Sequence, residues 1–144
     1  MEKKEKHLEF LQNNISRMNQ CSFQMKGWAI TIVSALIAIY VATITETCPG
    51  NKMYIFVAIA PTVLFWFLDA LYLSKENKFI GMYNDVAGIT PEDKRIELKD
   101  YEISMKKYKG WKYSIWKAMI SPSESVLYGM IIVGLIAFGI FARG

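Results

Sequence analysis

The stretch that decides the fold is GWAITIVSALIAIYVATIT, residues 27–45, which contains no charged residue. As a helix at 1.5 Å per residue it would rise about 28 Å, close to the ~30 Å hydrocarbon core of a bilayer. A helix in a soluble core keeps a polar stripe on one side, and this stretch has none. The pattern therefore predicts a transmembrane helix.

Two further blocks of the chain have the same character. Residues 53–74 contain one charge, Asp69, and residues 125–142 contain none. Hydrophobic residues make up 53% of the chain and charged residues only 21%, which favours three membrane spans over three core helices of a soluble bundle. Pro61 removes one backbone hydrogen bond from the second span, so we expect that helix to bend or loosen there.

Basic residues are distributed unevenly between the connecting segments. Residues 1–26 carry five lysines and arginines, and residues 75–120 carry ten, whereas residues 46–52 carry only Lys52. Because basic segments stay in the cytoplasm, the N-terminus and residues 75–120 are expected inside and the C-terminus outside. The predicted fold class is an all-α membrane protein with three transmembrane helices, N-in and C-out, and a cytoplasmic helical part.

The N-terminal segment, residues 1–26, is predicted to be an amphipathic helix that continues directly into the first span. Its apolar residues follow a heptad-like spacing that begins with Leu8, Leu11, Ile15 and Met18. Two interpretations remain open. The stripe packs on a second cytoplasmic helix of the same chain, or it is a seam through which subunits self-associate.

The cytoplasmic region 75–120 divides at Thr90-Pro91, which is typical of a helix start, and residues 91–109 are expected to form a charged helix. The segment 110–120 combines Trp111 and Trp116 with lysines, so we expect it to lie on the inner leaflet or to cover the cytoplasmic helices. Ten basic residues between positions 75 and 117 are offset by seven acidic ones, so no nucleic-acid partner is expected.

The chain contains few of the residue types that form catalytic or metal sites in other proteins. The chain has one histidine, His7, and its two cysteines, Cys21 and Cys48, are predicted on opposite sides of the membrane. Cys48 is then either an unpaired thiol or a bridge to a second subunit. We find no metal cluster, no catalytic set and no phosphate-binding loop, so we expect no cofactor and no enzymatic activity.

Asp69 is costly to keep within a span, because an ionisable group in the hydrocarbon is unfavourable. It lies near the inner boundary of the second span, at the depth where Lys26 and Trp28 begin the first. We interpret it as a structural acid satisfied by Lys26, Trp28 or a backbone group, with Lys26 as the expected partner. The alternative is a proton or cation site in the lining of a small ion or solute pathway.

Two strings of sequence point to a family. Ile15-Ser16-Arg17-Met18, Ser22-Phe23 and Lys26-Gly27-Trp28 enter the first span, and Phe65-Trp66-Phe67-Leu68-Asp69-Ala70-Leu71-Tyr72-Leu73 leaves the second. Both strings resemble a group of small bacterial inner-membrane proteins, mostly hypothetical, some of which are encoded near phage-defence genes. The resemblance covers roughly residues 8–86. It implies a bacterial inner-membrane location, an accessory or defence role, and proximity of Arg17, Lys26, Trp28 and Asp69.

The functional expectation follows from these observations together. The sequence favours a non-enzymatic multi-pass protein of the bacterial inner membrane that oligomerises or binds a cytoplasmic partner, with the lipid bilayer as its environment. A membrane-acting effector or an anchor in a defence system would fit this description. A small ion or solute pathway with Asp69 in the lining is the alternative.

Overall fold

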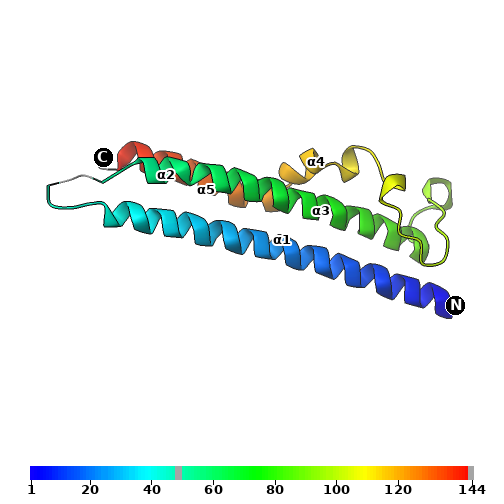
Figure 1. Ribbon diagram of the computed structural model, residues 1–144. Coiled ribbons are helices and arrows are strands. Elements are labelled where there is room, and N and C mark those ends of the chain that lie inside the picture. Colours follow the sequence, from blue (N-terminus) through cyan, green and yellow to red (C-terminus); the bar gives the residue numbers. More distant parts are fainter. Residues whose placement is uncertain (48–49, 143–144) are drawn as a thin grey trace. The chain divides into compact units, whose positions relative to one another are not determined.

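The computed structural model describes residues 1–47 and 50–142, so Cys48 and the expectations attached to it lie outside the described residues. The described chain is all-helical, without a strand. Its long elements are α1 (Glu2–Ala42), α3 (Ile59–Ala87) and α5 (Pro122–Phe141) (Figure 1). The short ones are α2 (Met53–Val57), α4 (Ile115–Met119) and three 3-10 turns, η1 (Glu92–Lys94), η2 (Met105–Lys107) and η3 (Trp111–Tyr113).

Three helices of the described chain, counting α2 and α3 together, are long and apolar enough to cross a membrane. The expected spans are therefore present as helices, and the polar N-terminal helix does run without a break into the first of them. The first helix ends at Ala42 rather than at Thr45, and the third begins at Pro122, three residues before the uncharged block. Ser121, in an extended conformation, precedes Pro122 at the first helical position, a favourable way to start a helix.

The helix of the second span is interrupted close to Pro61, as the sequence predicts. α2 ends at Val57 and α3 starts at Ile59, with a turn at Ala58 between them. Pro61 has no N–H to bond the carbonyl of Val57, and its ring crowds that carbonyl. Directly after the proline, Thr62 donates both its hydroxyl and its backbone N–H to the carbonyl of Ala58, at 2.8 Å and 3.3 Å.

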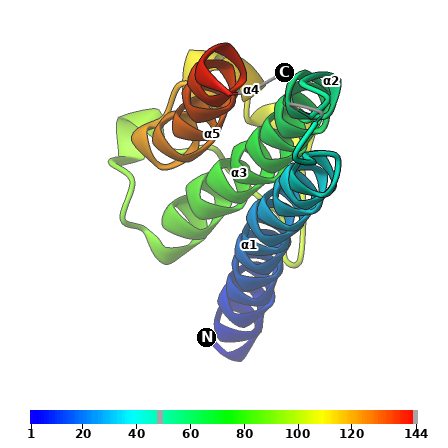
Figure 2. The same ribbon diagram turned by 90° about the vertical axis from the view of Figure 1, so that its left-hand side faces the viewer.

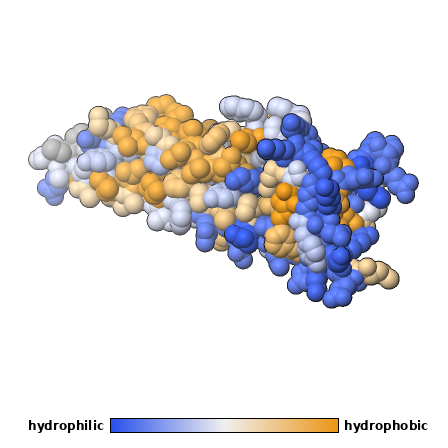
Figure 3. Space-filling view, turned by 45° about the vertical axis from the view of Figure 1, so that its right-hand side comes forward, coloured by the Kyte–Doolittle hydropathy of each residue, from blue (hydrophilic) through white to orange (hydrophobic). Residues whose placement is uncertain are grey.

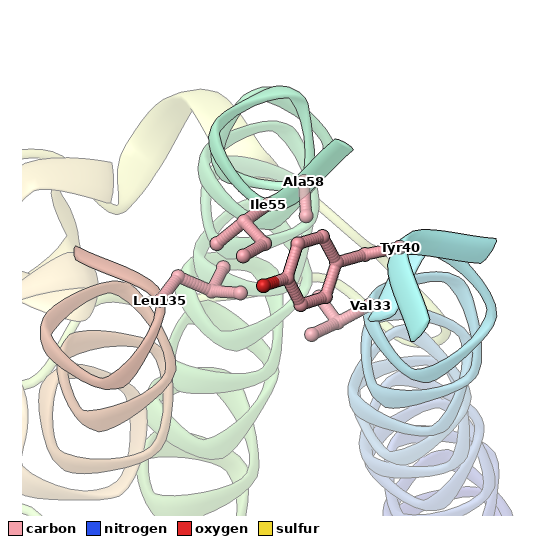
Figure 4. Close-up of a cluster of buried hydrophobic side chains, with 5 residues drawn as sticks. All are labelled: Val33, Tyr40, Ile55, Ala58 and Leu135. Atoms are coloured by element: carbon pink, nitrogen blue, oxygen red, sulfur yellow. The ribbon is translucent and has the colours of Figure 1, made fainter. Parts of the chain in front are cut away.

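The chain forms two compact units. The first, which we call the membrane unit, comprises residues 23–69 and 119–144, of which residues 48–49 and 143–144 are not described. The second comprises residues 1–22 and 70–118, and we call it the cytoplasmic unit after the location that the sequence predicts for it. In the membrane unit, α1, α2–α3 and α5 run side by side (Figures 1 and 2). Their shared core contains Val33 and Tyr40 from α1, Ile55 and Ala58 from the second span, and Leu135 from α5 (Figure 4).

Hydrophobic side chains gather on the visible outer surface of the membrane unit (Figure 3). Many large ones are exposed, including Leu64, Met130 and Phe141. A soluble protein rarely leaves this much apolar surface in contact with water. Their exposure agrees with helices that are surrounded by lipid.

The expected charged helix over residues 91–109 is wrong. This segment contains only the short turns η1 and η2, and most of the backbone between them is irregular or extended. Tyr101 even adopts a left-handed conformation with φ of 59°, which no helix accommodates. The reason is packing: Ile96 and Leu98, two residues apart, both lie against the core of the cytoplasmic unit, which an extended chain allows and a helix does not.

The core of the cytoplasmic unit is built around α1 and α3. Leu11 from α1, Phe79 and Met82 from α3, and Tyr108 are buried together. α3 ends at Ala87, because Gly88 takes a positive φ of 80° and Ile89 donates its N–H back to the carbonyl of Asn84.

Candidate functional site

Polar side chains from α1 and α5 converge on Asp69 of α3. This residue lies on α3 with no exposed area. Its Oδ2 atom accepts a hydrogen bond from Lys26 Nζ on α1 at 2.6 Å and another from the Tyr128 hydroxyl on α5 at 2.8 Å. The expected ion pair between Lys26 and Asp69 is thus present, and the acid connects all three candidate spans of the described chain.

A second carboxylate, Glu124, completes the group. It lies in the first turn of α5, where an acidic side chain is favoured by the helix dipole, and only 1% of its surface is exposed. Its Oε1 atom accepts a hydrogen bond from Lys26 Nζ at 2.9 Å, whereas its Oε2 atom is buried with no partner in the described part of the chain. We call Lys26, Asp69, Glu124 and Tyr128 the ionic cluster.

Aromatic side chains hold the surroundings of the ionic cluster in place. Trp66 of α3 stacks on Tyr128, with ring centroids 6.2 Å apart and an interplanar angle of 10°. The indole N–H of Trp66 donates to the carbonyl of Met119 over 3.0 Å. These contacts fix the start of α5 beside α3 and thereby fix the direction of the Tyr128 hydroxyl.

Trp28, also expected near Asp69, contacts α3 at Phe65, four residues before Asp69. The ring of Trp28 packs edge-on against Phe65 at 6.5 Å between centroids, and 54% of Trp28 is exposed. Arg17 is exposed and belongs to the cytoplasmic unit. The proximity of Arg17 to Asp69 that the resemblance implies stays a prediction.

The apolar stripe of α1 packs against other residues of the same chain. Leu11 has no exposed area and packs with Phe79 and Tyr108, while Ile15 and Met18 are partly buried against the same core. Leu8, the remaining member of the stripe, is half-buried. This arrangement corresponds to packing within the chain. The stripe contacts the C-terminal part of α3 and the loop around Tyr108.

The aromatic segment 110–120 exposes both of the tryptophans expected at the membrane interface. Trp111 in η3 is 61% exposed and Trp116 in α4 is 66% exposed. Neither is needed for the core of the cytoplasmic unit, so both rings are available to a bilayer surface. Contact with lipid stays a prediction for these two residues.

The cytoplasmic unit contains one buried polar pair. The hydroxyl of Tyr108 donates to Asp85 Oδ2 at 2.6 Å. Burial raises the pKa of Tyr108, and the hydrogen bond to Asp85 raises it further. Tyr108 therefore keeps its proton and is a structural donor rather than an acid in any reaction.

His7 and Glu102 join α1 to the loop. The His7 ring lies 3.1 Å from the carbonyl oxygen of Glu102, and only 3% of the residue is exposed. The N–H of Lys99 and the ammonium of Lys107 hold the pKa of the Glu102 carboxyl below its ordinary value. These contacts hold the loop on both sides of Tyr101.

The chemistry available at the ionic cluster is acid–base and electrostatic. Within residues 1–47 and 50–142, no group of three or more His, Cys, Asp or Glu side chains could hold a metal ion. Comparisons with protein-family models, curated proteins and solved structures found no match for this chain.

Proposed function

We propose that this chain is a non-enzymatic multi-pass membrane protein that self-associates within the bilayer through one face of α1. The observation that supports this is a run of small residues on the outer surface of the first span. All of its members are exposed: Gly27, Thr31, Ser34, Ala35, Ala38 and Ala42. At 100° per residue they fall within an arc of about 100°, opposite the buried side of α1. We call this surface the α1 outer face.

Small residues on the outer surface of a membrane helix indicate a site where another helix packs closely. Lipid chains provide no hydrophobic driving force for helix association, so helices associate where small side chains let backbones approach closely. A Cβ atom added at Gly27 would meet nothing within 4 Å, so packing inside the chain does not explain this glycine. On the other candidate spans, small outward residues such as Ala60, Gly134 and Ala137 are interspersed with large ones such as Phe56, Phe67 and Val133.

Enlarging the α1 outer face should therefore disperse the oligomer without unfolding the chain. We expect Ala35→Leu combined with Ala38→Leu to weaken self-association about ten-fold or more, equivalent to about 1.4 kcal/mol, because the added side chains hold two backbones apart. The measurement is the apparent Kd for association in detergent or liposomes by single-molecule photobleaching or energy transfer.

The matched control uses exposed alanines on the other helices. Ala60→Leu combined with Ala137→Leu adds the same atoms to α3 and α5 and should leave association unchanged. Equal association of both double variants and the wild type would refute the α1 outer face as the seam.

An ion or solute pathway lined by Asp69 has less support. Asp69 has no exposed area, and its Oδ2 atom is already occupied by two donors. A residue bound in this way does not line an open path within one chain. The cytoplasmic unit, with its exposed tryptophans and lysines, remains available for a cytoplasmic protein partner, as the sequence suggested.

We also propose that the chain sits N-in and C-out in a bacterial inner membrane. The uneven distribution of basic residues supports the orientation, and the resemblance of the two strings supports the location and an accessory role in defence. Reporter fusions at Gly50 and Gly144 should give periplasmic signals, and a fusion at Thr90 a cytoplasmic signal. A cytoplasmic reporter at Gly144 would contradict the three-span topology.

A further inference from the structure

The charges of the ionic cluster do not balance if every group is ionised. Lys26 Nζ contacts Asp69 Oδ2 at 2.6 Å and Glu124 Oε1 at 2.9 Å, so one ammonium faces two carboxylates. Asp69 is fully buried and Glu124 is 1% exposed, so water does not reach either to compensate the excess negative charge. An uncompensated buried charge is costly, and such a group takes up a proton instead.

The positions of the oxygen atoms indicate where that proton lies. Asp69 Oδ2 accepts hydrogen bonds from both Lys26 and Tyr128, which favours its ionised form. Among the described residues, the Glu124 side chain accepts a hydrogen bond from Lys26, at Oε1, and its buried Oε2 has no partner. An ionised carboxylate would leave Oε2 unsatisfied, whereas a protonated carboxyl has an O–H to donate.

Asp69 is the available acceptor for that O–H. The carboxylates of Asp69 and Glu124 both lie against the same ammonium, with Lys26 Nζ at 2.6 Å and 2.9 Å. Two carboxylates that share a site in this way do not both ionise, and a shared proton removes their repulsion. The ionisable groups facing Glu124 are Lys26 from α1, Asp69 from α3 and Tyr128 from its own helix.

We propose that Glu124 is a proton-binding site, and that at neutral pH it carries a proton that it shares with Asp69. The ligand is a proton rather than a metal cation, because the ammonium of Lys26 already lies against both carboxylates and would repel a second cation. With the proton bound, the ionic cluster is neutral and joins α1, α3 and α5. Removal of the proton leaves one excess negative charge at the contact of these helices.

The test is infrared spectroscopy of the full-length protein in nanodiscs. The wild type should show a C=O band of a protonated carboxyl group at neutral pH, and the band should not change when Na⁺ or K⁺ is added. Selective ¹³C labelling of glutamate should shift the band, and labelling of aspartate should not. This arm needs no mutation, so it does not depend on whether a variant folds.

Variants provide a second test, of both the carboxyl band and the thermal stability. Glu124→Gln, which mimics the protonated acid, should remove the band and keep the melting temperature at neutral pH. The wild type should lose thermal stability as alkali removes the proton, and Glu124→Gln should lose much less over the same pH range. Glu92→Gln, in the exposed turn η1, is the control and should keep the band.

Three results would overturn the proposal. The first is absence of a protonated carboxyl band at neutral pH. The second is a band that disappears when Na⁺ or K⁺ is added, which would assign the site to a metal cation. The third is a band that shifts with labelled aspartate instead of labelled glutamate. Each of these results leaves the association test on the α1 outer face unaffected.

Discussion

Replacing Lys26 with methionine should destabilise the membrane unit by about 3–5 kcal/mol at neutral pH. Lys26 is the cation that contacts both Asp69 and Glu124, and its side chain is only 23% exposed. Methionine keeps much of the volume of the lysine stem but leaves at least one buried carboxylate without a counter-charge. Breaking a buried ion pair from one side has a cost of this size, since the remaining charge is uncompensated.

The measurement is the free energy of unfolding from a denaturant titration in detergent, compared with a lysine that has no such role. Lys94→Met, in the exposed turn η1, should change that free energy by less than about 0.5 kcal/mol. A Lys26→Met loss as small as the Lys94→Met loss would show that the ionic cluster does not stabilise the unit.

Removing the orphaned charge should reverse part of this loss. Asp69→Asn added to Lys26→Met removes a negative charge at the same place, so the double variant should be more stable than Lys26→Met alone. Lowering the pH should likewise narrow the gap between Lys26→Met and the wild type, because protonation neutralises the orphaned carboxylates. A double-mutant cycle without coupling between positions 26 and 69 would contradict the ion pair as an energetic unit.

The sequence predicted those parts of the fold that depend on local pattern. The uncharged runs identify the three candidate spans, and Pro61 indicates the interruption of the second. The pairing of Lys26 with Asp69 was also predictable, because both residues sit at the same depth on antiparallel neighbouring helices. A buried charge at the boundary needs a partner, and a lysine at that depth is the simplest one.

Glu124 and Tyr128 were missed for physical reasons. Glu124 directly precedes the third uncharged block, in a Ser-Pro-Ser-Glu segment that indicates a break rather than a buried site. Its role arises from tertiary packing, because α5 begins at Pro122 and turns the carboxylate towards Lys26. An acidic residue at the same membrane depth as Asp69 was the signal that could have located it.

The loop after Thr90 shows that residues typical of a helix start do not ensure that a helix follows. Thr90-Pro91-Glu92 has the residues of a helix start, yet only the three-residue η1 follows. Helix propensity is weak compared with burial, and a charged helix without an apolar stripe gains little from packing. The spacing of Ile96 and Leu98, two residues apart, was the better indicator of an extended segment.

Replacing Leu11 with alanine should destabilise the cytoplasmic unit by about 2–5 kcal/mol. Leu11 has no exposed area and packs among Phe79, Met82 and Tyr108, so truncation leaves a cavity. The neighbouring Phe10 is 47% exposed, and Phe10→Ala is the matched control, with a much smaller loss expected. The measurement is amide hydrogen exchange over residues 1–22 and 70–87, which reports the opening free energy of this unit.

The same variant distinguishes the two interpretations of the apolar stripe. If the stripe packs inside the chain, Leu11→Ala should accelerate hydrogen exchange in the cytoplasmic unit and leave the apparent Kd for self-association unchanged. If the stripe is a seam between subunits, Leu11→Ala should disperse the oligomer at a concentration where the wild type stays associated. Because Leu11 contacts residues of α3 and has no area left for a second chain, we expect the first outcome.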